Sequence, residues 1–395
     1  MTHRSRSAAL AGLFLAALAL RPQIVGVGPL IDEIQGDLDA SHALVGLLGT
    51  IPVLCMGLFA PVAAYLSARL GTRRAMTIGL ALIGTFGVLR ALAPSAALVV
   101  LLTWGVGIGM GLGNALAPLA VRETVPERPA TGTGVYTTGI QIGSTVTAAI
   151  AVPLAGVLGG WRGALIALSA VACVIAVAWA VLERGGEVHV RRPGRLFPRL
   201  PWRSRTAWLL VAIFGAMGSA YYGLNAWLPD AYGERGWSDS SAGLLLAAMN
   251  LTAIPCSFLI PWLSDRHGGR RPWLAGVTLF FAVGAIGLVA LPGAAYAWAL
   301  LAGIAQGGAF ALVMTLPLDF ESTRERVGAL VGLMLGGGYT IAAVAPFVLG
   351  AVRDVTGSFD AVLWVCAGFA CLLVVLVNLL PRTARAAPVG DYAGG

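Results

Sequence analysis

Charge is scarce in this sequence. Only 11% of its 395 residues are Asp, Glu, Lys or Arg, against roughly 25% in a typical soluble domain. Hydrophobic residues make up 58% of the chain, and the mean hydropathy is +0.84. So little charge excludes an ordinary soluble domain, and it makes the long apolar stretches candidates for membrane-spanning helices.

Patterns that bind metals or form disulfides are missing as well. The cysteines all lie in apolar runs without metal or redox spacing, which indicates small core residues: Cys55, Cys173, Cys256, Cys366 and Cys371. The histidines fall in predicted loops or the N-terminal tail: His3, His42, His189 and His267. The apolar segments also lack the paired carboxylates or nucleophile–base pair of a membrane enzyme. We therefore expect a protein that is not an enzyme and that binds no cofactor.

Acidic residues are absent from the predicted membrane interior. The nearest ones lie at the ends of apolar segments: Asp32, Glu33, Glu123, Asp230 and Asp319. Carriers that move protons usually hold them on an intramembrane carboxylate or histidine. The sequence therefore gives no support to proton coupling through a buried titratable side chain.

What the chain does contain is a series of twelve apolar segments, each long enough to cross the ~30 Å hydrocarbon core with about 20 helical residues. Their approximate limits are 8–31, 43–66, 75–93, 97–120, 132–156, 162–182, 207–229, 242–263, 272–291, 296–318, 326–350 and 361–380. The first resembles a signal peptide, but its apolar pattern resumes at Ile24, so we interpret it as an uncleaved helix. The predicted fold class is all-α and integral to the membrane.

A nine-residue sequence occurs twice and divides the chain into halves. Leu66–Arg74 reads LSARLGTRR and Leu263–Arg271 reads LSDRHGGRR, an offset of 197 residues (263 − 66). Such a repeat indicates two fused copies of one multi-helix unit, which is the usual construction of secondary transporters. We expect two pseudo-symmetric six-helix bundles, residues 1–182 and 207–395, joined by a basic linker over residues 183–206.

The positions of the arginines predict the orientation. With the N-terminus inside, the inner segments hold 21 arginines and the outer ones hold four, while only Arg21 lies well inside a span. The positive-inside rule then places both termini in the cytoplasm, as expected for a multi-pass protein of the cell (inner) membrane. The linker holds seven of these arginines. Its charge fits contact with anionic lipid, and we expect the lipid bilayer rather than a nucleic acid as its partner.

With six plus six spans and a Gly/Arg-rich loop after the second and the eighth, the chain resembles the major facilitator superfamily. In that family this loop often reads Gly-x-x-x-Asp-Arg-x-Gly-Arg-Arg. The resemblance implies a conformational or gating role for matching residues in the two copies: Arg69, Gly71, Arg73, Asp265, Arg266, Gly268 and Arg270. Asp265 could pair with a neighbouring helix end and latch one conformation. In the first copy Ala68 replaces this aspartate, which puts such a latch in doubt in the N-terminal half, and the arginines equally suit a topological anchor.

Within the superfamily, the first span narrows the resemblance. Leu20-Arg21-Pro22 and Gly28-Pro29-Leu30 are similar to the cyanate and nitroimidazole permease group, as are Tyr221-Tyr222 and Trp227-Leu228-Pro229 in the seventh span. This resemblance covers essentially the whole chain. It implies a permease, and it does not choose between the two kinds of substrate.

Arg21 is the strongest candidate for a substrate-binding residue. It lies near the middle of the first span, where insertion of an arginine costs roughly 2.5–3.5 kcal/mol. Because arginine keeps its proton, it must face a wet cavity, a counter-charge or an anionic ligand. The neighbouring Pro22 lacks an N–H group and is predicted to kink the helix there, freeing the carbonyl of Leu18. A purely structural role, with Arg21 tying helices together through carbonyls, is the alternative.

Other polar residues near mid-span predict a shared cavity. They lie on the predicted inner helices, and the third, sixth, ninth and twelfth spans carry none near their centres. On the fifth span, Thr137, Gln141 and Ser144 share one face. The proposed substrate-binding residues are Arg21, Asn114, Gln141, Tyr221, Tyr222, Asn250, Gln306 and Tyr339. For Asn114 and Tyr222, helix packing explains the position equally well.

These observations predict a monomeric alternating-access carrier of a small-molecule substrate. We expect a small anionic or polar, cyanate-like solute held by Arg21. The alternative is an exporter of neutral nitroheterocycles or similar drugs. Import and export both stay open, as does the coupling ion or exchange mode.

Overall fold

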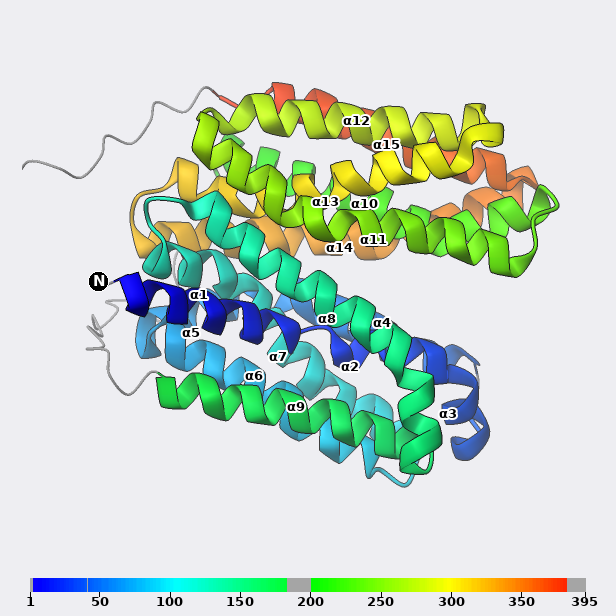
Figure 1. Cartoon of the computed structure of the whole chain (residues 1–395), viewed down its shortest axis with the longest axis horizontal. Coiled ribbons are helices and arrows are strands. Elements are labelled where there is room, and N and C mark those ends of the chain that lie inside the picture. Colours follow the sequence, from blue (N-terminus) through cyan, green and yellow to red (C-terminus); the bar gives the residue numbers. More distant parts are fainter. Residues whose placement is uncertain (1–2, 41, 183–199, 382–395) are drawn as a thin grey trace, which may run out of the picture.

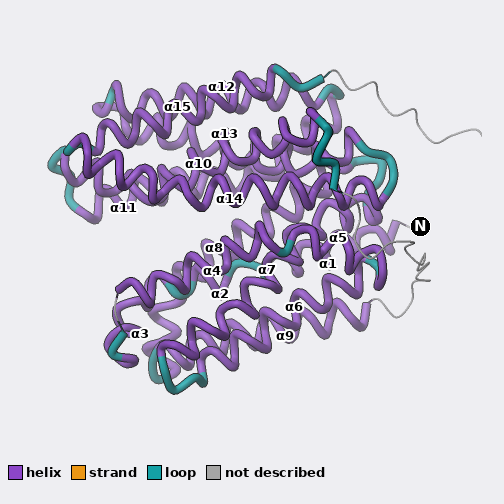
Figure 2. Tube along the Cα trace, turned by 180° about the vertical axis from the view of Figure 1, so that it is seen from behind, coloured by secondary structure: helices purple, strands orange, loops and turns teal. Residues whose placement is uncertain are grey.

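The computed structural model describes residues 3–40, 42–182 and 200–381, and within these ranges the chain forms helices joined by short loops, without a strand (Figure 2). The helices of the N-terminal half are α1 (His3–Leu18), α2 (Pro22–Val25), the 3-10 helix η1 (Gly28–Leu30), α3 (Ile31–Leu38), α4 (His42–Leu58), α5 (Ala60–Leu70), α6 (Thr72–Ala91), α7 (Ala96–Thr124), α8 (Pro129–Leu158) and α9 (Trp161–Leu182).

The C-terminal half is more regular. Its helices are α10 (Arg205–Glu234), α11 (Asp239–His267), α12 (Arg270–Ala290), the 3-10 helix η3 (Pro292–Ala294), α13 (Ala295–Phe320), α14 (Arg324–Thr356) and α15 (Phe359–Asn378). Figure 1 shows the two halves as separate bundles, one above the other in that view. The predicted linker over residues 183–206 lies outside the described residues as far as residue 199.

The predicted membrane fold is confirmed. Among the described residues, eleven helical segments are long and apolar enough to cross a membrane, and one bent pair makes a twelfth. That pair is Leu47–Leu58 and Ala60–Leu70, which meet at an angle of 54°. The sequence predicted a single segment over 43–66 here. The bend lies at Phe59, directly before Ala60-Pro61, and the missing N–H group of the proline cannot continue the hydrogen bonds of α4.

The first span is interrupted where Arg21-Pro22 predicted a kink. Helix α1 ends at Leu18 with tight i to i−3 bonds, in which the amides of Ala19 and Leu20 donate to the carbonyls of Ala16 and Ala17 (both 3.2 Å). Helix α2 restarts at Pro22, so Arg21 lies between two helices. The Leu18 carbonyl packs against Gly143 of α8, where an added Cβ would come within 2.5 Å of that oxygen. Helix α8 therefore approaches the break closely because residue 143 has no side chain.

The two halves touch along two lines, α8 against α11 and α4–α5 against α14. On the first line, the hydroxyls of Thr138 and Ser257 are 2.8 Å apart, and the Thr137 hydroxyl donates to the Ser257 carbonyl (3.2 Å). On the second, an added Cβ at Gly57 would lie 3.1 Å from the carbonyl oxygen of Gly336. Small residues thus let the backbones of opposite halves meet.

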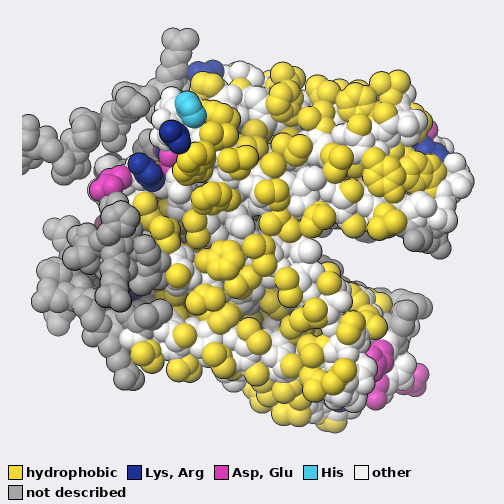
Figure 3. Space-filling view, viewed as in Figure 1, with side chains coloured by type: hydrophobic (Ala, Val, Ile, Leu, Met, Phe, Trp, Pro, Cys, Tyr) yellow, Lys and Arg dark blue, Asp and Glu magenta, His cyan; other side chains and the backbone are white. Residues whose placement is uncertain are grey.

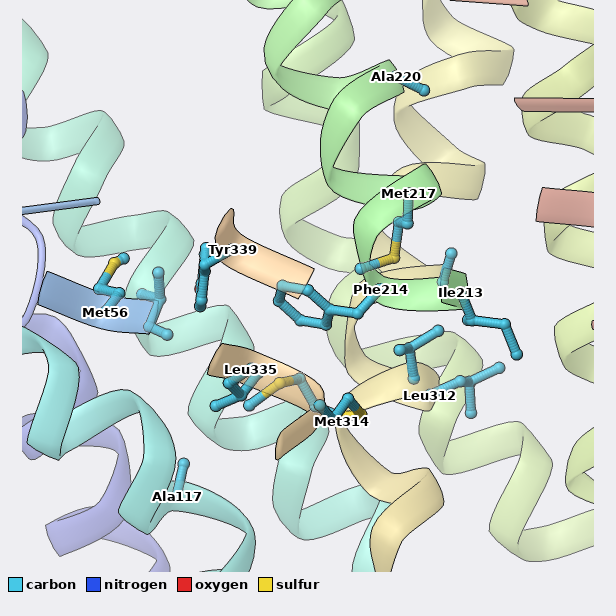
Figure 4. Close-up of a cluster of buried hydrophobic side chains, with 14 of the residues drawn as sticks. Met56, Ala117, Ile213, Phe214, Met217, Ala220, Leu312, Met314, Leu335 and Tyr339 are labelled. Carbon is cyan, nitrogen blue, oxygen red and sulfur yellow. The ribbon is translucent and has the colours of Figure 1, made fainter. Parts of the chain in front are cut away.

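The larger of two buried apolar clusters among the described residues continues across this contact. Figure 4 shows Met56 of α4 and Leu335 and Tyr339 of α14 on one side of Phe214 from α10. The rings of Phe214 and Tyr339 meet edge to face with centroids 4.9 Å apart. The outer flank of the molecule is covered by hydrophobic side chains, while charged ones gather at its two ends (Figure 3). This distribution is the one a bilayer requires.

Ion pairs tie helices within each half at the end away from the start of α1. Arg162 binds Asp37 (2.9 Å) and donates to the carbonyls at the end of α6. Arg235 does the same in the other half, binding Asp360 (2.7 Å) and the carbonyls at the end of α12. Because neither pair crosses between the halves, each bundle is braced separately.

Candidate functional site

A cavity of about 1010 Å³ lies between the two bundles. It is visible as the notch in Figure 3 and opens at the end opposite to the start of α1. We call that end the open end, and the end where α1 begins the closed end. The cavity is lined by α2, α4, α8, α10, α11, α13 and α14, so both halves contribute to it.

The structure brings together most of the residues that the sequence predicted. Seven of the eight proposed binding residues line the cavity: Arg21, Gln141, Tyr221, Tyr222, Asn250, Gln306 and Tyr339. Thr137 and Ser144, predicted to share a face with Gln141, line it too. Asn114 does not. It is only 1% exposed within α7, and in the described part of the chain neither its amide nitrogen nor its oxygen has a hydrogen-bond partner.

Arg21 reaches from the N-terminal half towards the C-terminal half. Its guanidinium lies in the electrostatic reach of the phenol groups of Tyr222 of α10 and Tyr339 of α14, which line the same cavity. Its Nε atom is buried and has no hydrogen-bond partner among the described residues, and the same holds for Oε1 of Gln306. Unpaired buried polar atoms are costly. At the wall of a cavity, they are atoms that a ligand can satisfy.

One wall of the cavity is held by a network on α10 and α11. The Tyr221 hydroxyl donates to Oδ1 of Asn250 (3.2 Å), whose Nδ2 donates to Oδ1 of Asn225 (3.0 Å). Asn225 in turn donates to the Tyr221 carbonyl (2.9 Å). The sequence reasoning missed Asn225, although it follows Tyr221 by four residues and therefore shares its helix face. The network fixes the Tyr221 ring and orients both amides.

The rest of the wall is mainly aromatic and aliphatic. Phe214, Phe310 and Tyr339 lie on one side, and the rings of Tyr221 and Tyr222 meet edge to face at 5.3 Å. Within the described ranges, no Asp or Glu lines the cavity, and Arg21 is the one charged residue that does. A fixed cation without a carboxylate beside it makes the local potential positive, which favours anionic or neutral solutes over cations.

Sequence comparisons agree with this architecture. The profile of the Major Facilitator Superfamily matches residues 11–238 and 230–391. The chain belongs to this superfamily.

Two relatives from Escherichia coli (strain K12) match nearly the whole length of this chain. The 2-nitroimidazole transporter is 31% identical over 95% of this chain and 95% of its own. The cyanate transport protein CynX is 31% identical over 95% of this chain and 96% of its own. Among solved structures, the proton:xylose symporter XylE superposes with a TM-score of 0.78 at 14% identity, covering 96% of this chain and 97% of its own. The transporter FucP, in its outward conformation, gives 0.77 at 14% identity and covers 94% and 97%. The chain is thus a Major Facilitator Superfamily transporter of small solutes and not an enzyme.

In this superfamily member, Asp265 does meet a neighbouring helix end. Its Oδ2 accepts hydrogen bonds from the backbone amide (2.6 Å) and the hydroxyl (2.8 Å) of Thr131, at the start of α8 in the other half. Its Oδ1 lies 3.7 Å from Arg270, which also binds Asp319 (2.7 Å). The carboxylate therefore joins the two halves at the closed end, at a helix N-terminus whose dipole favours an anion.

The N-terminal half, where Ala68 replaces the aspartate, is joined differently. Arg324 at the start of α14 donates to the Thr72 hydroxyl (2.6 Å) and to the carbonyl of Ser67 (3.2 Å). It also pairs with Glu123 (3.1 Å). The second contact between the halves thus uses a cation where the first uses an anion. Sequence reasoning missed Arg324, because only the fold brings it to Ser67, 257 residues away.

The remaining loop residues lie at the closed end. Gly71 and Gly268 have φ of 89° and 73°, which only glycine adopts without strain, so both end a helix sharply. Arg69 lies over the ring of Tyr65 (5.4 Å), and Arg266 lies over Trp262 (5.4 Å). The Arg73 carbonyl accepts from the Trp179 indole (3.2 Å). These three arginines therefore contact their own half, whereas Asp265 joins the two halves.

Proposed function

We propose that this transporter carries a small, flat anion, such as cyanate or a monocarboxylate, by alternating access. The observation that carries the proposal is the position of Arg21. A fixed cation lies in a break of the first span, lines the cavity and has no carboxylate partner among the described residues. Burial of an unpaired guanidinium costs several kcal/mol, and an anionic ligand offsets that cost.

The surrounding groups suit such a ligand. Arg21 faces the phenol groups of Tyr222 and Tyr339, which belong to the other half. An anion seated on Arg21 would reach the same hydroxyls and so contact both halves at once. A ligand that bridges the halves favours the conformation in which they approach, which is the requirement for alternating access. In this proposal the chain acts as a monomer in the inner membrane with both termini cytoplasmic, so the cavity faces outward.

A second candidate is export of a neutral nitroheterocycle. The observation that favours it is the aromatic wall of Phe214, Phe310 and Tyr339, on which a flat neutral ring can stack. In that case Arg21 would donate hydrogen bonds to a nitro group without requiring net charge. The two candidates differ in how much they depend on the charge of residue 21.

Arg21→Gln separates them, because glutamine keeps hydrogen-bond donors and removes the charge. The purified wild-type protein and the variant are compared for thermal stabilisation by cyanate, benzoate and neutral 2-nitroimidazole, and for counterflow in proteoliposomes. Loss of a charge-assisted bond of ~1.5–3 kcal/mol predicts roughly 10- to 100-fold weaker anion binding and transport. Arg21→Lys should recover part of the loss, since an ammonium group lacks the planar two-pronged contact.

Arg326→Gln is the matched control. It removes one arginine from the closed end, where the side chain of Arg326 is 72% exposed, and it should leave anion binding unchanged. If Arg21→Gln binds and exchanges anions as the wild type does while 2-nitroimidazole remains a substrate, the neutral-solute candidate replaces the anion proposal.

A further inference from the structure

A second arginine, Arg90, is entirely buried outside the cavity. It lies at the end of α6 with 0% of its surface exposed. Its Nη2 donates to the Gln23 carbonyl (2.8 Å) and to Oε1 of the same side chain (2.9 Å). Gln23 then donates from Nε2 to the Ser169 hydroxyl (2.8 Å) and the Leu165 carbonyl (3.3 Å) of α9. These bonds attach α2, the short helix that follows Arg21, to α6 and α9.

Arg90 has no counter-charge. Within the described part of the chain it makes no ion pair, and its Nε and Nη1 atoms are buried without a hydrogen-bond partner. The next residue, Ala91, belongs to a cluster of buried apolar side chains that includes Val27, Leu30 and Leu168. Burying an unpaired charge among apolar side chains costs free energy. The need for one hydrogen bond therefore does not explain why an arginine stands here. Glutamine or asparagine would supply the same kind of donor without charge.

The hydrogen bond itself is explained by the broken helix. The amide of Val27 donates to the Ile24 carbonyl (3.3 Å) and not to that of Gln23, so Gln23 lacks its ordinary helical donor. Arg90 supplies one. Residue 87 has to be glycine for this contact, because an added Cβ would lie 2.9 Å from Oε1 of Gln23 and also against the Ser169 hydroxyl.

In the C-terminal half, the positions at the same offset hold no amide, hydroxyl or guanidinium side chain. With the offset of 197 residues, Gln23 corresponds to Ala220 (23 + 197), Arg90 to Gly287 (90 + 197) and Ser169 to Cys366 (169 + 197). There the helix is continuous, since α10 runs from Arg205 to Glu234, and Gly287 packs against the Trp298 indole. The six-helix unit therefore forms without a buried cation at this place, and Arg90 belongs to the half that carries Arg21.

We propose that Arg90 is a positioning residue that also acts as a second fixed cation, holding α2 in place and raising the positive potential of the cavity beside Arg21. Gln23 is two residues from Arg21 and contacts Arg90 directly. Field lines from a charge in a low-dielectric wall concentrate in the adjoining wet cleft. The preference for an anionic substrate that would result rests on the function proposed above. The positive potential of the cavity does not depend on that function.

Gln23→Glu tests the charge while nearly preserving the shape. A carboxylate at this position would pair with Arg90 and cancel its charge, and the Ser169 hydroxyl can turn to donate to it. Arg90→Gln removes the charge by a different route, and Arg90→Lys keeps it. If the charge of Arg90 does not reach the cavity, a counter-charge placed directly beside it by Gln23→Glu should not reach the cavity either, and the cavity potential should stay unchanged.

The potential is measured with a single thiol at Ser144→Cys, on the cavity wall, in full-length protein whose five native cysteines are replaced. Rates are compared for an anionic sulfonatoethyl and a cationic trimethylammonioethyl methanethiosulfonate. Because the two reagents carry opposite charges, their rate ratio doubles the effect of any potential. Loss of the Arg90 charge should lower the anionic-to-cationic ratio roughly fivefold in both Gln23→Glu and Arg90→Gln, and Arg90→Lys should retain it. Gly293→Cys, at the open end of the other half, is the control site whose ratio should not change.

An unchanged ratio at position 144 in both charge-removing variants overturns the proposal and makes Arg90 purely structural. A fall of the rate ratio in Arg21→Gln alone also overturns the proposal for Arg90, and it leaves the proposed function standing. A third outcome is a fall of the rate ratio in Gln23→Glu, Arg90→Gln and Arg21→Gln while the wild type transports no anion. That result supports Arg90 as a second fixed cation and rejects the proposed substrate class. Should Arg90→Gln fail to accumulate, Gln23→Glu and Arg90→Lys still decide between the outcomes.

Discussion

The contact between Asp265 and the start of α8 should control how readily the closed end opens. Asp265→Asn is the smallest change that removes the charge. Asparagine keeps one acceptor oxygen for the amide or hydroxyl of Thr131, which now donate at 2.6 and 2.8 Å, but it loses the attraction to the N-terminus of α8. It also loses the attraction to Arg270, 3.7 Å away.

The magnitude follows from the kind of bond. Hydrogen bonds to a charged group contribute about 1.5–3 kcal/mol, and the side chain of Asp265 is only 8% exposed, so water screens them little. A free-energy change of about 1.4 kcal/mol corresponds to a factor of ten in an equilibrium. The fraction of molecules in which the halves have separated at the closed end should therefore rise roughly 10- to 100-fold.

The assay is the reactivity of a thiol that the closed end covers. Ala64 of α5 is 7% exposed and lies against Gly328 of α14, so Ala64→Cys in a background without native cysteines should react slowly with N-ethylmaleimide. Asp265→Asn should raise that rate at least tenfold. Asp319→Asn is the matched control, because Asp319 binds Arg270 within its own half and makes no ion pair or hydrogen bond across the contact among the described residues. Equal rates in the two variants, or no increase in either, would refute the assignment of Asp265 as a link between the halves.

Two further predictions concern packing and the cavity wall. Gly143→Ala should lower the melting temperature, because the new Cβ would meet the Leu18 carbonyl at 2.5 Å and overpacking costs about 1–3 kcal/mol; Gly156→Ala, in open space on the same helix, should not, and equal melting temperatures would contradict the close approach. Asn225→Ala should weaken ligand binding in a thermal-shift titration by several-fold, since Asn250 loses a partner worth about 1 kcal/mol. Asn378→Ala, which breaks only a bond to its own helix, should have no effect, and a matching effect there would mean that the network does not orient the wall.

Features that depend on local sequence could be predicted. The twelve spans follow from the length of apolar runs, and the broken first span follows from Pro22, whose missing N–H group acts on its own helix. The cavity face of α8 could also be predicted, because Thr137, Gln141 and Ser144 recur at helical spacing whatever lies opposite. The family follows from the same local patterns together with the repeated loop.

The sequence alone proposed both Asn114 and Gln141 as binding residues, with helix packing as an equally good explanation for Asn114, and only the structure separates them. Both are amides on inner helices, but helical spacing does not specify how a helix is rotated against its neighbours. The rotation of α7 turns Asn114 into a packed interior, while that of α8 turns Gln141 to the cavity. Rotation is set by the close contacts of many small residues, such as Gly111 of α7 against the backbone of Cys55.

Long-range polar contacts were likewise decided by tertiary structure. The sequence determined that Arg21 is a mid-span cation, that Asp265 follows a span, and that Ala68 interrupts the first copy of the loop. Only the folded chain brings Arg324 to Ser67 in place of the missing aspartate. Only there does Arg90 become a buried cation that has no carboxylate partner in the described part of the chain. Whether a charge has a partner depends on groups tens or hundreds of residues away, so its energetic cost, and the function that offsets this cost, becomes visible once the helices are packed.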